Sequence, residues 1–179
     1  MEPTRKIEKV GLRNLHMEDY DQLAKSFKRI YADSDVFWTR AQIKKLITIF
    51  PEGQVVIIVD DKIVGCALSI IVNYDMVKGD HTYAQVTGNE TFNTHNPHGN
   101  ILYGIEVFIH PDYRGLRLAR RMYEYRKELC EKLNLKAIMF GGRIPNYHKY
   151  ADQMRPKEYI EKVRNREIYD PVLLSLIHI

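Results

Sequence analysis

The spacing of apolar residues predicts helices in the first third of the chain and strands directly after it. Apolar side chains recur every three or four positions over His16–Tyr31 and Thr39–Phe50, the periodicity of amphipathic helices. Thr39 is placed to cap the second helix. Gln54–Val59 and Ile63–Val72 are instead continuous β-branched runs, a pattern typical of strands covered on both faces. A further strand is expected before the first helix, over residues 7–13.

A short turn joins the two β-branched runs, and a long polar connection follows them. Asp60-Asp61-Lys62 is a hairpin signal. Residues 73–100 form a connection of a length that is uncommon in compact domains and often functional. Because Tyr83–Asn100 is rich in Thr, Asn and His, we expect it to contribute to a site for an acceptor substrate. A metal site is the alternative, but the spacing of its ligands matches no rigid pattern, so none is expected. Its candidate ligands are His81, His95, His98, Asp80 and Glu90.

The second half of the chain reads as a strand, a helix and a strand. Leu102–His110 and Leu135–Phe140 have strand patterns, and Leu116–Leu133 has helical spacing. Short turns join the three, so they predict a βαβ unit with a right-handed crossover. The fold class is therefore α/β.

The end of the chain predicts two short helices, over Tyr147–Asp152 and Lys157–Arg166, and then a strand beginning at Asp170–Leu173. The last six residues, LSLIHI, resemble the translation of a transposon-end sequencing adaptor. We therefore expect a native domain over residues 1–173 and a foreign tail over residues 174–179. A genuine short strand at a natural end is the alternative.

Composition limits the function classes. The 179 residues are 45% hydrophobic and 28% charged, which is ordinary for one globular domain. The charged N-terminus has no signal-peptide pattern, and the longest apolar run is half a membrane span, so a cytoplasmic protein without a membrane segment is expected. Cys66 and Cys130 lie in apolar patterns, as buried thiols in a reducing compartment do. The net charge of +4 suits a small anionic ligand, and glutamates interleave with the basic residues after position 114, so nucleic acid is not expected.

The segment Ile105–Met122 carries the clearest chemistry. A strand ends at Pro111, a tight turn follows, and a helix begins without Ser, Thr, Asn or Asp beside its first turn. Gly115 lets a ligand approach the backbone closely. Uncapped amides at a helix N-terminus bind anions, and their hydrogen bonds to a charged phosphate outweigh the helix dipole. Additional positive charge comes from Arg114, Arg117, Arg120 and Arg121.

The run from Arg114 to Ala119, RGLRLA, resembles the acyl-CoA motif of the GNAT N-acetyltransferases, Arg/Gln-x-x-Gly-x-Gly/Ala. Arg114 and Ala119 match its ends, and Arg117 stands where the family usually has glycine. The resemblance implies a three-layer GNAT fold with a mixed, twisted central sheet, and acetyl-CoA as the cosubstrate. The residues that it assigns to the cosubstrate are Val107, Phe108, Ile109, Arg114, Gly115, Leu116, Arg117, Leu118, Ala119 and Arg120.

The resemblance also implies a mechanism, in which a primary amine attacks the thioester without an acyl-enzyme. An amine of pKa ~10.4 is mostly protonated at neutral pH, a deficit of about 4 kcal/mol that a base or desolvation must offset. Glu106 is the candidate base, and a carboxylate paired with a nearby arginine is the equal alternative. Tyr147 and Tyr150 are candidate acids for the leaving thiolate, with packing roles as the alternative.

A wider resemblance includes the strings GGRIPNYHKYADQM and PKEYIEKV. They are similar to the GNAT half of bacterial proteins that fuse this domain to a carbon–nitrogen hydrolase. Such a hydrolase domain is therefore an expected C-terminal partner. The competing hypothesis for function is a non-catalytic acyl-CoA-sensing module that regulates the fused hydrolase.

Overall fold

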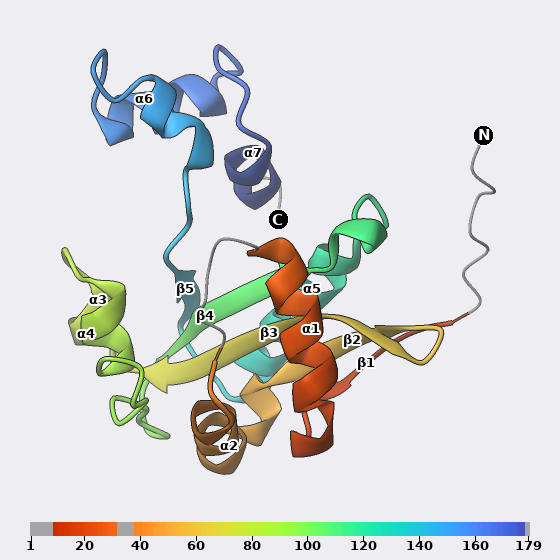
Figure 1. Ribbon diagram of the computed structural model, residues 1–179. Helices are drawn as coiled ribbons and strands as arrows, with labels where there is room; N and C mark the ends of the chain where they lie inside the picture. The colour runs from red at the N-terminus through yellow and green to blue at the C-terminus, as the bar shows by residue number, and fades with distance from the viewer. Residues whose placement is uncertain (1–8, 32–37, 178–179) are drawn as a thin grey trace, which may run out of the picture. The chain divides into compact units, whose positions relative to one another are not determined.

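A computed structural model of the chain describes residues 9–31 and 38–177 (Figure 1). The chain folds as two compact units, one ending at Phe140 and one beginning at Gly141. In the described part, the first unit contains the strands and the second contains short helices only. Each unit is described by itself.

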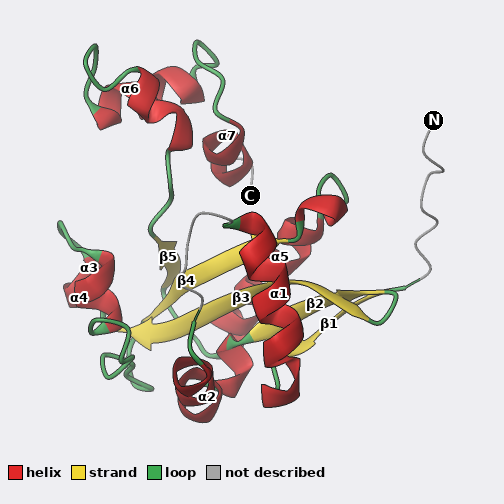
Figure 2. Cartoon of the chain, viewed as in Figure 1, coloured by secondary structure: helices red, strands yellow, loops and turns green. Residues whose placement is uncertain are grey.

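The first unit is built on a mixed, five-stranded sheet with the order β1-β2-β3-β4-β5 (Figure 2). Neighbours from β1 to β4 are antiparallel and β4 and β5 are parallel, which confirms the mixed sheet and the βαβ unit expected from the sequence. Ile7, the predicted start of the first strand, lies outside the described residues. The strands are β1 (Val10–Asn14), β2 (Val55–Val59), β3 (Lys62–Val72), β4 (Ile101–Ile109) and β5 (Ala137–Phe140).

Helices cover both faces of the sheet, so the three layers expected from the sequence are confirmed. α1 (Tyr20–Ile30) and α2 (Arg40–Ile49) bury their apolar sides in the larger core cluster, against β3 and β4. α5 (Leu118–Lys132) packs on the opposite face through Leu118 and Met122. Figure 1 shows α1 and α5 on opposite sides of the sheet.

Two local sequence signals are confirmed. Thr39 caps α2, because its Oγ1 accepts a hydrogen bond from the Gln42 amide (3.2 Å) and Gln42 Oε1 accepts one from the Thr39 amide (2.8 Å). Asp60 and Asp61 close the β2–β3 hairpin with φ of 47° and 63°, as a turn that matches the strand twist requires. Both strands are buried on both faces along nearly their whole length.

The connection between β3 and β4 is more ordered than its sequence suggested. It contains α3 (Tyr74–Val77) and α4 (Tyr83–Thr87), and Thr82 caps α4 in a reciprocal pair with Gln85. Phe92 is buried in the larger core cluster, with its ring against Trp38. The prediction of a plain polar loop is therefore wrong, since a Thr-x-x-Gln capping pattern starts a helix inside it.

The second unit is organised by the buried carboxylate of Asp170. This side chain accepts hydrogen bonds from the amides of Val172 (3.1 Å) and Leu173 (3.0 Å) and from the Tyr159 hydroxyl (2.8 Å). The strand predicted at Asp170–Leu173 is wrong, because an Asp cap followed by Pro at the first position begins a helix. The helices of this unit are α6 (Pro156–Arg164) and α7 (Pro171–Ile177).

Short 3₁₀ helices complete the described elements: η1 (Met17–Asp19), η2 (Pro51–Gly53), η3 (Pro111–Tyr113) and η4 (Pro145–Lys149). Cys66 and Cys130 are both buried free thiols, as expected. Among the described helices, none combines the length and the apolar character that a membrane crossing needs. The boundary at residue 173 stays a prediction, and residues 178–179 lie outside the described part.

Candidate functional site

The parallel ladder between β4 and β5 ends halfway along β4. β5 pairs with Ile101–Gly104 and with no later residue of β4. At the same place the pairing with β3 shifts: Ser69 lies opposite Gly104 and Leu68 opposite Glu106, so Ile105 is an extra residue. A bulge of this kind bends its strand and re-aims the following side chains. The last part of β4 therefore has an outer edge that none of the described strands covers.

The backbone of Val107 points to this outer edge. His110 donates its N–H to Val64 O (2.7 Å), so alternate residues before it direct their backbone groups to β3. Val107 is out of phase with that set, and its N–H donates to Glu106 Oε1 instead (3.0 Å). The Val107 and Ile109 side chains pack with the α5-side cluster and Phe108 packs in the opposite core. At the outer edge, Val107–Ile109 therefore present backbone N–H and C=O groups rather than side chains.

The turn after β4 opens onto an uncapped helix. η3 is closed by bonds from the amides of Tyr113 and Arg114 to His110 O and Pro111 O (2.9 and 3.2 Å). The backbone is then left-handed at Gly115 (φ 80°) and Arg117 (φ 56°). α5 begins at Leu118, two residues later than predicted, and no side chain caps its first turn. The amides at its start are thus available to an anion.

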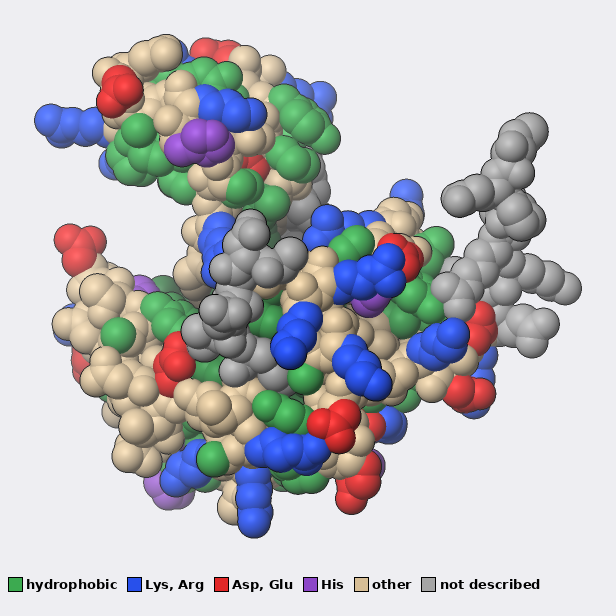
Figure 3. All heavy atoms as spheres, in the orientation of Figure 1, with side chains coloured by type: hydrophobic (Ala, Val, Ile, Leu, Met, Phe, Trp, Pro, Cys, Tyr) green, Lys and Arg blue, Asp and Glu red, His purple; other side chains and the backbone are tan. Residues whose placement is uncertain are grey.

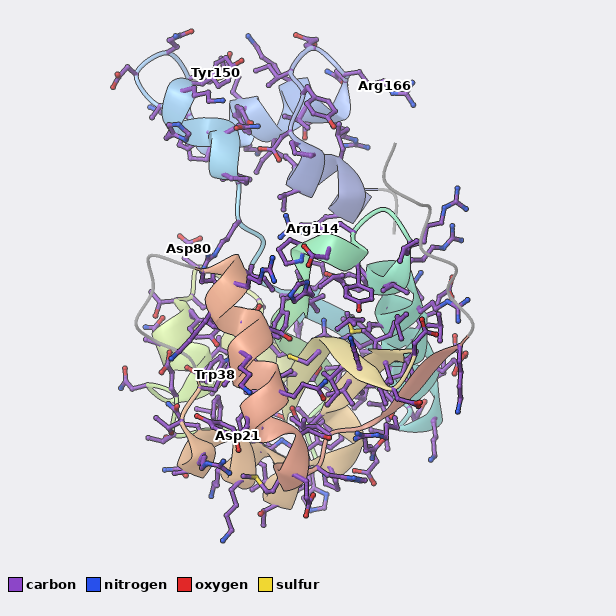
Figure 4. All side chains as sticks on the ribbon, turned by 45° about the vertical axis from the view of Figure 1, so that its right-hand side comes forward. Asp21, Trp38, Asp80, Arg114, Tyr150 and Arg166 are labelled. Carbon is purple, nitrogen blue, oxygen red and sulfur yellow. The ribbon has the colours of Figure 1, made fainter. Side chains whose placement is uncertain are left out.

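Basic side chains surround this turn. All four arginines between positions 114 and 121 are exposed, and Figure 4 marks Arg114 on the turn itself. Arg120 also pairs with Glu124 four residues later on the helix, with Nε 3.0 Å from Oε1. Figure 3 shows further basic side chains over the face that carries α1. Uncapped amides and exposed arginines thus lie together at this turn, which makes it the candidate site for an anion.

The acetyltransferase (GNAT) family model matches residues 11–151 of this chain. The chain belongs to the GNAT family. Two relatives come from Bacillus subtilis (strain 168). The probable hydrolase YhcX is 41% identical over 170 residues, which cover 95% of this chain and 33% of YhcX. The uncharacterized N-acetyltransferase YkwB is 32% identical over 176 residues, which cover 97% of this chain and 78% of YkwB. The chain thus spans a third of the length of YhcX.

Solved structures share the GNAT fold of this chain. The loading GNATL domain of CurA from Lyngbya majuscula superimposes with a TM-score of 0.79 at 23% identity, over 96% of this chain and 84% of that domain. The GphF GNAT-like decarboxylase in complex with isobutyryl-CoA gives 0.68 at 19% identity, over 91% and 81% of the two chains. Identities this low show the fold alone.

Glu106, the candidate base, is half-buried on the bulge of β4. Its carboxylate accepts a hydrogen bond from the next amide in the chain, that of Val107. Arg126 is the nearby arginine that the alternative interpretation required, but its Nη2 donates to the backbone oxygen of Glu106 (2.9 Å). The carboxylate therefore lies at the outer edge of β4, and its role as a base stays a prediction.

Three polar side chains lie around the bulge: Tyr83 and Tyr103, to which the sequence gave no role of their own, and His81, which it named only as a candidate metal ligand. Tyr83 donates its hydroxyl to Ile105 O (3.3 Å), and burial, reinforced by the Glu106 carboxylate, raises the pKa of Tyr83 well above its ordinary value. His81 contacts Gly79 O through Nδ1 (2.9 Å), so Nδ1 carries the proton and Nε2 accepts from the Tyr103 hydroxyl (3.3 Å). This end of the connection therefore reaches the bulge of β4.

The other end of that connection has a structural role. His95 Nδ1 accepts a hydrogen bond from the Ile71 amide (3.1 Å), its ring stacks on Phe50, and burial lowers its pKa. Gly99 packs closely against the backbone of Val72. That Tyr83–Asn100 forms part of an acceptor site stays a prediction, and His95 and Gly99 have structural contacts within it. Within residues 9–31 and 38–177, no three His, Cys, Asp or Glu side chains gather as metal ligands would.

The two candidate acids, Tyr147 and Tyr150, belong to the second unit (Figure 4 labels Tyr150). The Tyr147 hydroxyl donates to Met154 O (2.9 Å). Both rings pack on Tyr159, with centroid distances of 5.5 Å. Both tyrosines therefore take part in packing within the second unit, and a role for either as an acid stays a prediction.

The sequence reasoning also missed Arg126, which is 2% exposed and reaches the bulge from α5. The signal was present in the spacing, because Arg126 stands four residues after Met122 and four before Cys130, on the buried stripe of the helix. A charged residue on the buried stripe of a helix needs hydrogen-bond partners inside the protein, and Arg126 has them.

Proposed function

We propose that this chain is an acyltransferase that moves an acetyl group from acetyl-CoA to a primary amine by direct attack. One observation carries the proposal: two backbone segments with open hydrogen-bonding groups follow each other in the chain. They are the outer edge of β4 beyond the bulge and the uncapped first turn of α5. Membership of the GNAT family supports the same reading.

The α5 turn fits the pyrophosphate of coenzyme A. A hydrogen bond from an amide to a charged phosphate contributes about 1.5–3 kcal/mol, against ~0.3–1 kcal/mol for the helix dipole. The amides of Gly115–Ala119 therefore supply most of the binding, and the exposed guanidinium groups of Arg114 and Arg117 add charge. A Cβ at Gly115 would meet no atom within 4 Å, so the backbone there faces open space.

The outer edge of β4 fits the extended pantetheine arm, whose amides pair with the backbone of Val107–Ile109 in the manner of an added strand. Glu106 then lies beside the thioester and accepts the proton of the attacking amine. The amine nitrogen bonds to the carbonyl carbon, the carbon–sulfur bond breaks, and the thiolate takes a proton to leave as free CoA. Tyr147 and Tyr150 are the proposed donors of that proton.

A second function is favoured by one specific observation. The chain matches only a third of YhcX, which is named a probable hydrolase. In a protein of that kind, the GNAT domain would bind acyl-CoA without transferring its acyl group, and the binding would regulate a carbon–nitrogen hydrolase domain. The sensor keeps the site described above and differs only in lacking acyl transfer.

Binding and turnover separate the two functions. The purified chain is titrated by calorimetry with CoA, acetyl-CoA and isobutyryl-CoA, and 3′-phospho-ADP and pantetheine serve as half-ligand controls. An amine panel of lysine peptides, polyamines and small metabolite amines then tests for release of free thiol. Binding with amine-dependent CoA release supports the acetyltransferase, and binding without release for any amine supports the sensor. If none of the thioesters binds, both proposed functions are refuted.

A further inference from the structure

The guanidinium of Arg126 is buried, and its hydrogen bonds go to two backbone oxygens and one hydroxyl. Nη2 donates to Leu68 O (2.7 Å) and Glu106 O (2.9 Å), and Nε donates to Ser69 Oγ (3.1 Å). Buried arginines usually face a carboxylate. Burial lowers the pKa of Arg126 to about 10, so the group stays a cation at neutral pH. A full positive charge is therefore held inside the bulge by backbone and hydroxyl dipoles, by the ring of Tyr123, whose centroid lies 5.7 Å from Cζ, and by the attraction of the Glu106 carboxylate.

The sheet is shaped to admit this group. Gly104 lies beside it, and a Cβ at Gly104 would fall 2.9 Å from Nη1 of Arg126. The ladder also opens at this point, since the pairing shifts between Leu68 and Ser69. Both features place the cation against the carbonyl of Glu106, on the β3 side of β4.

The carbonyl of Glu106 and the N–H of Val107 belong to one peptide group and point in opposite directions. Arg126 donates to the oxygen at one end, and the N–H at the other end donates to the Glu106 carboxylate on the outer edge (3.0 Å). Hydrogen bonds in a chain polarise one another, and a charged donor at the carbonyl strengthens the N–H at the far end.

We propose that Arg126 is a positioning residue that polarises the Glu106–Val107 peptide and makes the Val107 N–H a strong donor to the thioester carbonyl. The proposal rests on the acyltransferase function proposed above. In the free protein the Glu106 carboxylate occupies this donor. When the carbonyl oxygen takes the N–H, Glu106 is released beside the reacting carbon and is able to accept the proton of the amine.

The first test uses the free protein and needs no acyl-CoA. The ¹H chemical shift of the Val107 amide is measured by NMR in wild type, in Arg126→Met, and in Lys132→Met as a control on the exposed last turn of α5. Polarisation predicts a downfield amide in wild type and in the control, and an upfield shift in Arg126→Met. An unchanged Val107 shift in a folded Arg126→Met protein overturns the proposal.

Two further variants keep the test decisive if Arg126→Met does not fold. Arg126→Lys keeps the charge but cannot reach all three acceptors, and Gly104→Ala keeps arginine but pushes a methyl group onto Nη1. Both should shift the Val107 amide upfield, by less than the loss of charge would. If both leave that resonance in place, the proposal is wrong.

The second test adds acetyl-CoA labelled with ¹³C at the carbonyl. A strong donor moves the bound carbonyl resonance downfield of free acetyl-CoA in wild type, and Arg126→Met returns it towards the free value. We expect kcat to fall about tenfold with KM nearly unchanged, since weakening one donor of this kind loses less than deleting it. An amide shift without any binding of acetyl-CoA supports polarisation and refutes the proposed function. Binding with an unmoved carbonyl resonance in Arg126→Met refutes the role assigned to Arg126.

Discussion

Gly115 stands where the turn into α5 faces open space, and its replacement gives the sharpest test of the cosubstrate site. Its φ is 80°, and no atom lies within 4 Å of the place where a Cβ would be. A side chain at this position would therefore fit sterically and project into the space that the pyrophosphate is proposed to occupy. Gly115→Glu introduces a negative charge there.

Two effects of Gly115→Glu have to be estimated, the backbone strain and the charge repulsion. A side chain in the left-handed region costs roughly 1–2 kcal/mol, whatever its charge. A carboxylate about 5 Å from one phosphate charge adds about 1–3 kcal/mol of repulsion, for an effective dielectric constant between roughly 80 and 20. Because about 1.4 kcal/mol is a factor of ten in affinity, the charge alone should weaken acetyl-CoA binding roughly five- to 150-fold.

Calorimetry on three variants separates the two effects. Gly115→Gln has the same shape and strain as Gly115→Glu without the charge, and Gly11→Glu places the same charge on β1, where a Cβ also meets open space. We expect Gly115→Glu to bind far more weakly than Gly115→Gln, with the gap narrowing at high salt. Equal dissociation constants for Gly115→Gln and Gly115→Glu would refute a phosphate at the α5 turn.

Four further predictions concern the base, the two caps and the response of one cap to pH. Glu106→Gln should lower kcat about hundredfold while acetyl-CoA affinity stays near wild type, because the amide still accepts from Val107 but cannot take a proton; an unchanged rate across pH removes Glu106 from the mechanism. Asp170→Ala should destabilise the second unit by about 2–4 kcal/mol, measured by hydrogen exchange of α7, since it removes a cap and orphans the Tyr159 hydroxyl. Burial raises the pKa of the Asp170 carboxyl, but its hydrogen bonds outweigh burial and hold that pKa below its value in the unfolded chain. The carboxylate therefore stabilises the second unit fully at pH values above the unfolded-state pKa, and this stabilisation is lost as the pH falls through the folded-state pKa. If hydrogen exchange in the second unit does not respond to acid, this explanation is wrong. Thr39→Ala should cost about 1 kcal/mol in urea unfolding through loss of the α2 cap, and Thr39→Ser should restore it.

Much of the fold could be predicted because its signals are local. The Thr39 cap and the Asp60-Asp61 turn each act within four residues, and both were recognised. The same logic was available at Thr82, whose cap on α4 was overlooked. The error at Asp170–Leu173 has a physical cause, since a short apolar run does not distinguish a strand from a helix, and the Asp-Pro start should have decided it.

The site divides along the same line. The anion-binding turn follows from local sequence, because the absence of a cap and the presence of Gly115 can be read directly. The bulge at Ile105 cannot, since it exists only in the register between β3 and β4. Arg126 depends on both elements, and its burial follows from that register together with the missing side chain of Gly104.

Position 117 shows what the glycine of the acyl-CoA motif supplies. Arg117 occupies the place where the family usually has glycine, yet its backbone has the left-handed conformation that glycine adopts most easily (φ 56°). An arginine held there costs roughly 1–2 kcal/mol relative to a right-handed residue. The next residue, Leu118, is buried in the core cluster on the α5 side, and no side chain caps the start of the helix. The turn therefore has, at Arg117, the left-handed backbone that suits glycine, and a strained residue of this kind is typical of functional sites.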